Sequence, residues 1–107
     1  MIEIEYNRKK ISVTIKGHAE SGEYGHDLIC AACSQTAYIF ATAVMNMKEY
    51  GQEPKVKLAS GDCKIVFKPY KENREMVLFT LDNIAIGFKL LAKSYPENVS
   101  LEVIEKE

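Results

Sequence analysis

The sequence has little net charge, few cysteines and no long apolar run. Its 107 residues carry a formal net charge of −1, so no excess of basic charge indicates nucleic-acid binding. No uninterrupted apolar run approaches the roughly 20 residues that a membrane-spanning helix needs. The N-terminal heptapeptide MIEIEYN lacks the basic and apolar regions of a signal peptide. We therefore expect no direct contact with nucleic acid and no membrane association.

Cysteine content indicates the cellular compartment. The three cysteines are an odd number and no export signal accompanies them, so we expect no disulfide framework. A reducing cytoplasm is the expected location. A hydrophobic fraction of 47% with 27% charged residues is typical of a globular protein, and the length predicts a single domain covering residues 1–107.

Apolar periodicity predicts seven secondary-structure elements. Strands are expected where apolar and polar residues alternate, and helices where apolar residues recur every three or four positions. In chain order the elements are strands at 1–7 and 11–16, a helix at 27–50, strands containing Val56 and Leu58 and then Ile65 and Phe67, a helix at 72–94, and a strand containing Val99, Leu101 and Val103. The order ββαββαβ predicts an α+β fold, a two-layer sandwich of a mainly antiparallel or mixed sheet with two helices.

Three residues are expected to define element ends. Asp27 is the predicted N-cap of the first helix, and Gly51 its C′ residue. Gly61, within Ser60-Gly61-Asp62, is expected at a conformationally permissive position of a tight turn between two strands.

The segment from residue 17 to residue 35 carries the residues best suited to chemistry. It begins with a loop containing Gly17, Gly22 and Gly25, which is long for a connection in a small domain and is a candidate substrate loop. Cys30 follows Asp27 by three residues, in the first turn of the expected helix. The partial positive charge of a helix N-terminus favours a thiolate, so Cys30 is a candidate nucleophile; a small buried helix residue is the alternative.

Two histidines and two further polar residues could assist this thiol. His18 follows Gly17, where the chain can turn sharply, and it could accept and return the thiol proton; a solvated loop histidine is the alternative. His26 directly precedes the expected cap and competes with His18. Asp27 either caps the helix or orients the imidazole. Ser34 lies on the face of Cys30, where it either bonds a backbone carbonyl or lines the site.

Cys33 forms a C-x-x-C pair with Cys30. Such pairs occur in thioredoxin-like and zinc proteins, but a thioredoxin motif should follow the strand of a βαβ unit. A structural zinc site needs four ligands, and no second paired element accompanies this one. We therefore predict neither a metal nor a cofactor. Cys63 is expected on a strand, in the core or on the strand's face.

The segment as a whole resembles the signature of the ribosomal-processing cysteine proteases of bacteria, the Prp family. The matching residues are Gly17-His18-Ala19, Tyr24-Gly25, Asp27-Leu28-Ile29-Cys30-Ala31 and Ser34, with the same spacing of twelve between histidine and cysteine. The resemblance extends over nearly the whole chain. Cys33 departs from the family, which usually has a small aliphatic residue there.

This resemblance implies a function and an assembly. Cys30 is the implied nucleophile and His18 its partner in a Cys–His dyad. The implied protein is a homodimeric endopeptidase that removes the N-terminal extension from the precursor of large-subunit ribosomal protein twenty-seven. Two other functions stay open from the residues alone: a non-enzymatic ribosome-associated assembly domain, and a C-x-x-C redox or zinc protein.

Overall fold

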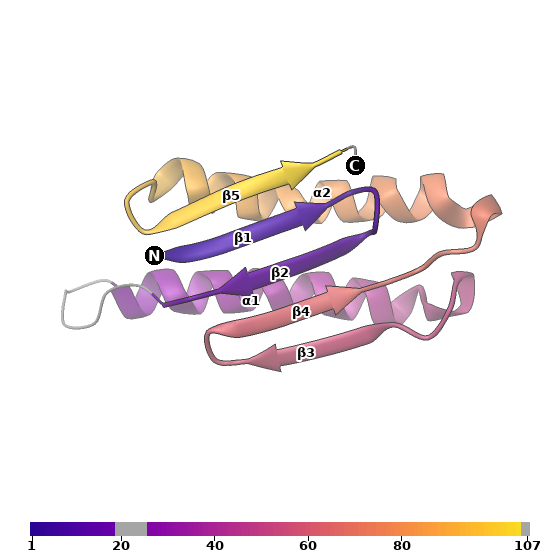
Figure 1. The fold of residues 1–107 in the computed structure, drawn as a ribbon, viewed down its shortest axis with the longest axis horizontal. Helices are drawn as coiled ribbons and strands as arrows, with labels where there is room; N and C mark the ends of the chain where they lie inside the picture. The colour runs from indigo at the N-terminus through magenta and orange to yellow at the C-terminus, as the bar shows by residue number, and fades with distance from the viewer. Residues whose placement is uncertain (19–25, 106–107) are drawn as a thin grey trace.

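The computed structural model describes residues 1–18 and 26–105, with the side chains described from residue 28 onward in the second range. Five strands and two long helices form a two-layer α+β sandwich (Figure 1). In chain order they are β1 Ile2–Asn7, β2 Ser12–Lys16, α1 His26–Asn46, β3 Lys55–Ala59, β4 Asp62–Val66, α2 Arg74–Ser94 and β5 Val99–Ile104. Short 3₁₀ turns, η1 Lys48–Tyr50 and η2 Lys71–Asn73, follow α1 and precede α2. The predicted fold class and the order ββαββαβ are confirmed.

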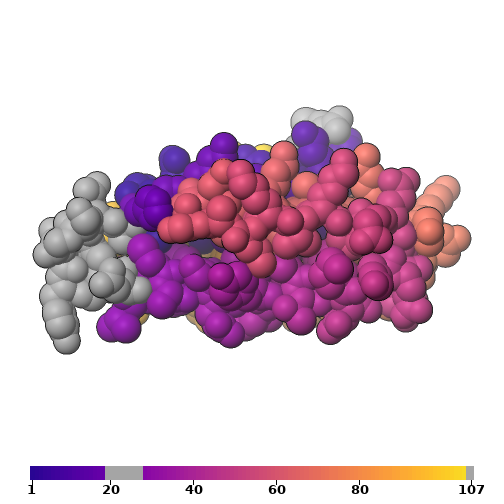
Figure 2. Space-filling model, turned by 90° about the horizontal axis from the view of Figure 1, so that it is seen from below, coloured from indigo at the N-terminus to yellow at the C-terminus, as the bar shows by residue number. Residues whose placement is uncertain are grey.

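The sheet is mixed, with the strand order β3-β4-β2-β1-β5. All neighbouring strands are antiparallel except β1 and β5, which are parallel. The chain returns from β4 through α2 to place β5 beside β1. Both helices cover the same face of the sheet, behind the strands in Figure 1. Figure 2 shows that the β3–β4 hairpin lies over α1 along one side of the molecule.

The core lies between the sheet and the two helices. Alternate residues of β1 and β2 point into it, and the register pairs Ile4 with Ile15 on this inner face. Tyr6 and Phe40 make an edge-to-face contact with ring centroids 5.8 Å apart, which joins β1 to α1. Phe88 of α2 lies 6.2 Å from Phe40, so aromatic contacts link all three elements. Burying each such side chain contributes about 1.5–3 kcal/mol.

The ends of both helices differ from the predictions. Helix α1 begins at His26 and ends at Asn46, with η1 completing the stretch expected to be helical to residue 50. Gly51 was predicted as the C′ residue of this helix, and this is wrong because α1 ends at Asn46 and Gly51 lies in extended backbone with a φ of −170°. Gly51 instead pairs with Pro69, and an added Cβ would lie 2.7 Å from the Pro69 Cα. Glycine is needed there because the two segments of the chain approach each other closely. Helix α2 begins at Arg74 because η2 occupies the three residues before it.

The two turns of the sheet both use positive φ. Gly61 has a φ of +70°, which confirms the predicted permissive position. Ile11 has a φ of +53°, although it is not glycine, and its side chain is 1% exposed. The second strand therefore begins at Ser12, one residue later than the alternation predicts.

One stretch of α1, Leu28–Asn46, is long and apolar enough to cross a membrane by length and composition alone. This finding differs from the sequence-based expectation of no membrane-spanning segment, which considered only uninterrupted apolar runs. The core helix of a soluble protein passes the same test, and Phe40 and Val44 of this stretch are fully buried against the rest of the fold.

Candidate active site

The end of β2 fixes the backbone that carries His18. Gly17 has a φ of +96°, and a Cβ at this position would collide with the carbonyl oxygen of Met1. The Gly17 amide donates a hydrogen bond of 3.0 Å to the carbonyl of Gly61, and the N-terminal ammonium donates one of 2.9 Å to the carbonyl of His18. The sharp turn expected at Gly17 is therefore present, held between the N-terminus and the β3–β4 turn.

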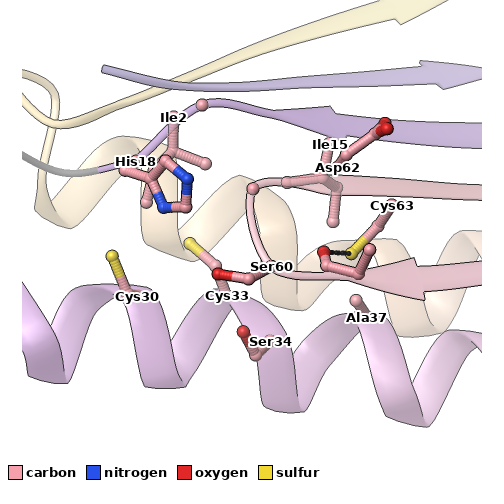
Figure 3. Close-up of a pocket in the computed structure, with 13 residues that line it drawn as sticks. Ile2, Ile15, His18, Cys30, Cys33, Ser34, Ala37, Ser60, Asp62 and Cys63 are labelled. Carbon is pink, nitrogen blue, oxygen red and sulfur yellow. Dashed lines mark hydrogen bonds between the residues drawn. The ribbon is translucent and has the colours of Figure 1, made fainter.

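Helix α1 supplies the thiols. Cys30 and Cys33 lie three residues apart, so helical geometry places them on neighbouring parts of one face. Cys30 is partly exposed, whereas Cys33 is 3% exposed. Figure 3 shows both sulfur atoms directed from α1 toward the layer that carries His18. Ser34, the next residue, is exposed.

One pocket brings these residues together. It has a volume of about 70 Å³ and is lined by His18, Cys30, Cys33 and Ser34 (Figure 3). Ser60 and Gly61 of the β3–β4 turn also line it. The structure thus places both predicted catalytic residues at a single small cavity between the sheet and the start of α1. Ser34 lines this cavity, which is one of the two roles that the sequence left open for it. Among the described residues, the hydroxyl of Ser34 donates to no backbone carbonyl, while that of Thr36 donates to the carbonyl of Ala32 at 2.9 Å.

Two features of the pocket escaped the sequence reasoning. The β3–β4 turn, expected only as a chain reversal, forms part of the wall, and Cys63 of β4 also lines the pocket. The register of β2 with β4 pairs Lys16 with Asp62 and so brings the turn beside Gly17. No local sequence signal reports this pairing, because the two segments are about 45 residues apart in the chain.

Some predicted residues lie wholly or partly outside the description. Gly22 and Gly25 of the proposed substrate loop are outside the described residues, as are the side chains of His26 and Asp27. The backbone of α1 begins at His26, so Asp27 is its second residue and not the N-cap that was predicted. Asp27 therefore lies two positions beyond the N-cap position, and Cys30 is the fifth residue of α1, just past the first turn in which it was expected.

Burial distinguishes the cysteines. The pKa of Cys33 is raised to about 11, mainly by burial and further by the negative charge that Cys30 would carry as a thiolate. Burial also raises the pKa of Cys63, whose thiol donates to the carbonyl of Ala59 at 3.4 Å. Both therefore stay protonated at neutral pH, and neither is suited to be the nucleophile.

No hydrogen bond joins the His18 ring to the Cys30 sulfur within the described part of the chain. Both instead border the same space, where a substrate group could lie between them. Catalytic hydrogen bonds are often long or absent without substrate and shorten in the complex. Within the same residues, no three His, Cys, Asp or Glu side chains are grouped as a metal would require.

Comparisons with known proteins identify the family. The family model described as Cysteine protease Prp matches residues 1–100. The chain is 24% identical over 93 residues to the ribosomal processing cysteine protease Prp of Staphylococcus aureus, covering 87% of this chain and 86% of that protein.

Solved structures share the fold. The S. aureus Prp crystal structure with a covalently linked product peptide has a TM-score of 0.72 at 24% identity, covering 96% of this chain and 99% of that one. A crystal structure from Streptococcus mutans has a TM-score of 0.69 at 25% identity, covering 98% of this chain and 93% of the other.

Proposed function

Since this chain belongs to the Prp family of cysteine proteases, we propose that it removes the N-terminal extension from the precursor of large-subunit ribosomal protein twenty-seven. The curated relative is named for ribosomal processing, and a relative's structure holds a product peptide, which supports a peptide substrate of this kind. The proposed site of action is the cytoplasm, where the precursor would be made.

One observation carries the proposal: Cys30 and His18 border the same cavity of about 70 Å³. His18 takes the proton of the Cys30 thiol, and the thiolate attacks the scissile carbonyl carbon. The tetrahedral intermediate expels the amine, which receives the proton from His18. Water then hydrolyses the thioester and regenerates the thiol.

Other groups around the pocket have proposed roles beside those of Cys30 and His18. Backbone N–H groups in the first turn of α1 are the proposed donors to the oxyanion, because the first four of a helix lack helical partners. Ser34, exposed on the pocket rim, is a proposed contact for the substrate backbone. Asp27 is proposed to support the first turn or the imidazole, and Gly17, Gly22 and Gly25 to shape substrate entry.

Cleavage of the precursor tests the proposal directly. The purified protein is incubated with the precursor, and the N-terminus of any new fragment is sequenced. We expect a single cut that releases the extension, and we expect the Cys30→Ala variant to produce none while keeping wild-type circular dichroism. Cys30→Ser, which retains the side-chain shape, should be nearly as inactive, because a serine hydroxyl is a far weaker nucleophile here. Cleavage by Cys30→Ala at the wild-type rate would refute the assignment of the nucleophile.

We further propose that the protein is a homodimer and that the outer face of α2 forms the contact. Met76, Phe79, Ile86 and Leu90 are 43%, 72%, 47% and 57% exposed and recur at helical spacing on one face. An exposed apolar stripe of this length is typical of a protein–protein contact, and one stripe can pair with its copy across a two-fold axis.

Mass in solution tests this surface. Phe79→Glu places a charge in the stripe and should halve the mass measured by light scattering. Leu28→Glu is the matched control, because Leu28 is also 72% exposed but lies at the start of α1. A dimer that survives Phe79→Glu would exclude this face.

A further inference from the structure

We infer that Gly61, in the β3–β4 turn, is a positioning residue for the imidazole of His18. An added Cβ at Gly61 would lie 2.5 Å from the ring carbon Cε1, closer still to Nε2 and 3.0 Å from Cδ2. The ring edge that carries Nε2 therefore packs directly against the bare α-carbon of this glycine. Any other residue would occupy space that the ring now fills.

Three contacts hold the turn where it can do this. The Gly17 amide bonds the Gly61 carbonyl at 3.0 Å, which ties the turn to the residue before His18. The β2–β4 register pairs Lys16 with Asp62, directly after the turn. Across the hairpin, the ammonium of Lys57 bonds the carboxylate of Asp62 at 2.6 Å. The turn is thus part of the sheet and forms a fixed surface for the ring.

The conformation of Gly61 adds a second requirement. Its φ of +70° lies in the left-handed region, which glycine adopts without cost and asparagine tolerates better than most residues. Backbone strain and collision with the ring can therefore be separated. An asparagine at this position introduces the collision with the ring but little backbone strain, whereas an alanine introduces both.

The consequence concerns the orientation of the base. His18 leaves the sheet at a glycine, and its ring borders the pocket that also contains Cys30. Packing against Gly61 restricts rotation of the ring, so that proton transfer to and from the thiol does not have to wait for a favourable rotamer. This inference rests on the proposed role of His18 as the base.

Chemical rescue provides the test. His18→Ala should be inactive and should regain activity when free imidazole enters the vacated space. In His18→Ala/Gly61→Asn the added side chain occupies that space, so we expect the rescued rate to fall at least tenfold. The control is His18→Ala/Lys57→Ala, which loosens the same hairpin without entering the ring's space and should keep its rescue within about twofold.

Single variants and stability complete the design. Gly61→Asn alone should lose at least tenfold in kcat/KM at an unchanged far-UV spectrum. In a double-mutant cycle, Gly61→Ala should lower the urea midpoint more when His18 is present than when residue 18 is alanine. The reason is that the added Cβ collides with the imidazole ring, which the alanine variant lacks. Equal shifts, or equal failure to fold, would overturn the inference.

The two proposals fail separately. An active His18→Ala variant would refute the role of His18 and leave Gly61 without a base to position. An inactive His18→Ala variant together with a fully active Gly61→Asn variant would leave the proposed function standing and overturn this inference alone.

Discussion

The guanidinium of Arg8 holds the carboxylate of Asp82 through two hydrogen bonds, each 2.9 Å long. The hydroxyl of Tyr6 donates a third, of 2.7 Å, to the same carboxylate. Arg8 also reaches Glu105 at 3.1 Å, and Arg74 donates to the Arg8 carbonyl at 3.2 Å. These bonds join the residue after β1 to α2, at the end of β1 opposite Ile2, which lines the pocket. The Arg8 hydrogen bonds hold the pKa of Asp82 below its usual range. Burial, together with the hydrogen bond to Asp82, raises the pKa of Tyr6.

Asp82→Asn should therefore lower stability and leave the chemistry intact. We expect a loss of about 1–2 kcal/mol in the free energy of unfolding at pH 7, at the lower end for a charged hydrogen bond because side chains about a third exposed are screened by water. Urea unfolding measures this. Lys57→Ala, which breaks an exposed pair with Asp62, is the control and should cost less.

The contact between Arg8 and Asp82 also makes the free energy of unfolding depend on pH in the acidic range. Because the pKa of Asp82 is lowered in the folded state, its contribution is complete above the unfolded pKa of about 3.9 and is lost as pH falls through the folded pKa. The difference in the free energy of unfolding between wild type and Asp82→Asn should thus begin to shrink below about pH 4. A constant difference down to pH 2 would show that the Asp82 charge is not responsible.

The two histidines should differ sharply in their effect on cleavage. We expect His18→Ala to lose most of its kcat and His26→Ala to keep the wild-type rate within a few-fold, because His18 borders the pocket and matches the family motif. Steady-state cleavage of the precursor measures both. If His26→Ala proved the more damaging change, His26 would be the base.

Asp27→Asn should be milder than either dyad variant. Asparagine keeps the shape and hydrogen-bonding oxygen of the side chain and removes only the charge. We therefore expect the helix and most of the activity to survive, as measured by circular dichroism and kcat. A loss as large as that of Cys30→Ala would assign Asp27 to the imidazole as its orienting carboxylate.

Cys33→Ala should retain cleavage and better withstand oxidants. The raised pKa of about 11 keeps Cys33 a buried thiol at neutral pH, so alanine removes little more than a small packed group. If Cys30 is oxidised to a sulfenic acid, Cys33 is the adjacent thiol that could condense with it. We expect the same peroxide exposure, assayed before any reductant is added, to remove more cleavage activity from wild type than from the variant. We expect iodoacetamide at pH 7.5 to label Cys30 before Cys33.

The opposite result would change the function assigned. A Cys33→Ala variant that lost activity under reducing conditions, or wild-type protein that carried bound zinc, would favour the C-x-x-C interpretation. Metal analysis of the purified protein beside the cleavage assay separates the two.

Local pattern was sufficient for the order of the elements, whereas the choice of His18 over His26 came from the resemblance to the Prp family. Alternation in β1 reports burial on one face because successive strand residues point to opposite sides, and Ile2, Ile4 and Tyr6 are buried as that pattern requires. The spacing of His18 and Cys30 led to a single pocket because Gly17 turns the chain at the end of β2. Gly51 misled the prediction, because a glycine that permits close approach looks the same in sequence as one that ends a helix.

The sequence by itself determined which segments become strands and helices, since each segment's own periodicity reports which of its faces is buried. Only the tertiary structure decided which segments meet. The parallel pairing of β5 with β1, the packing of Gly61 on His18 and the bond from Arg8 to Asp82 all join residues 40 or more positions apart. Such contacts depend on how the whole core packs around α1 and α2, and no local pattern of residue types records that.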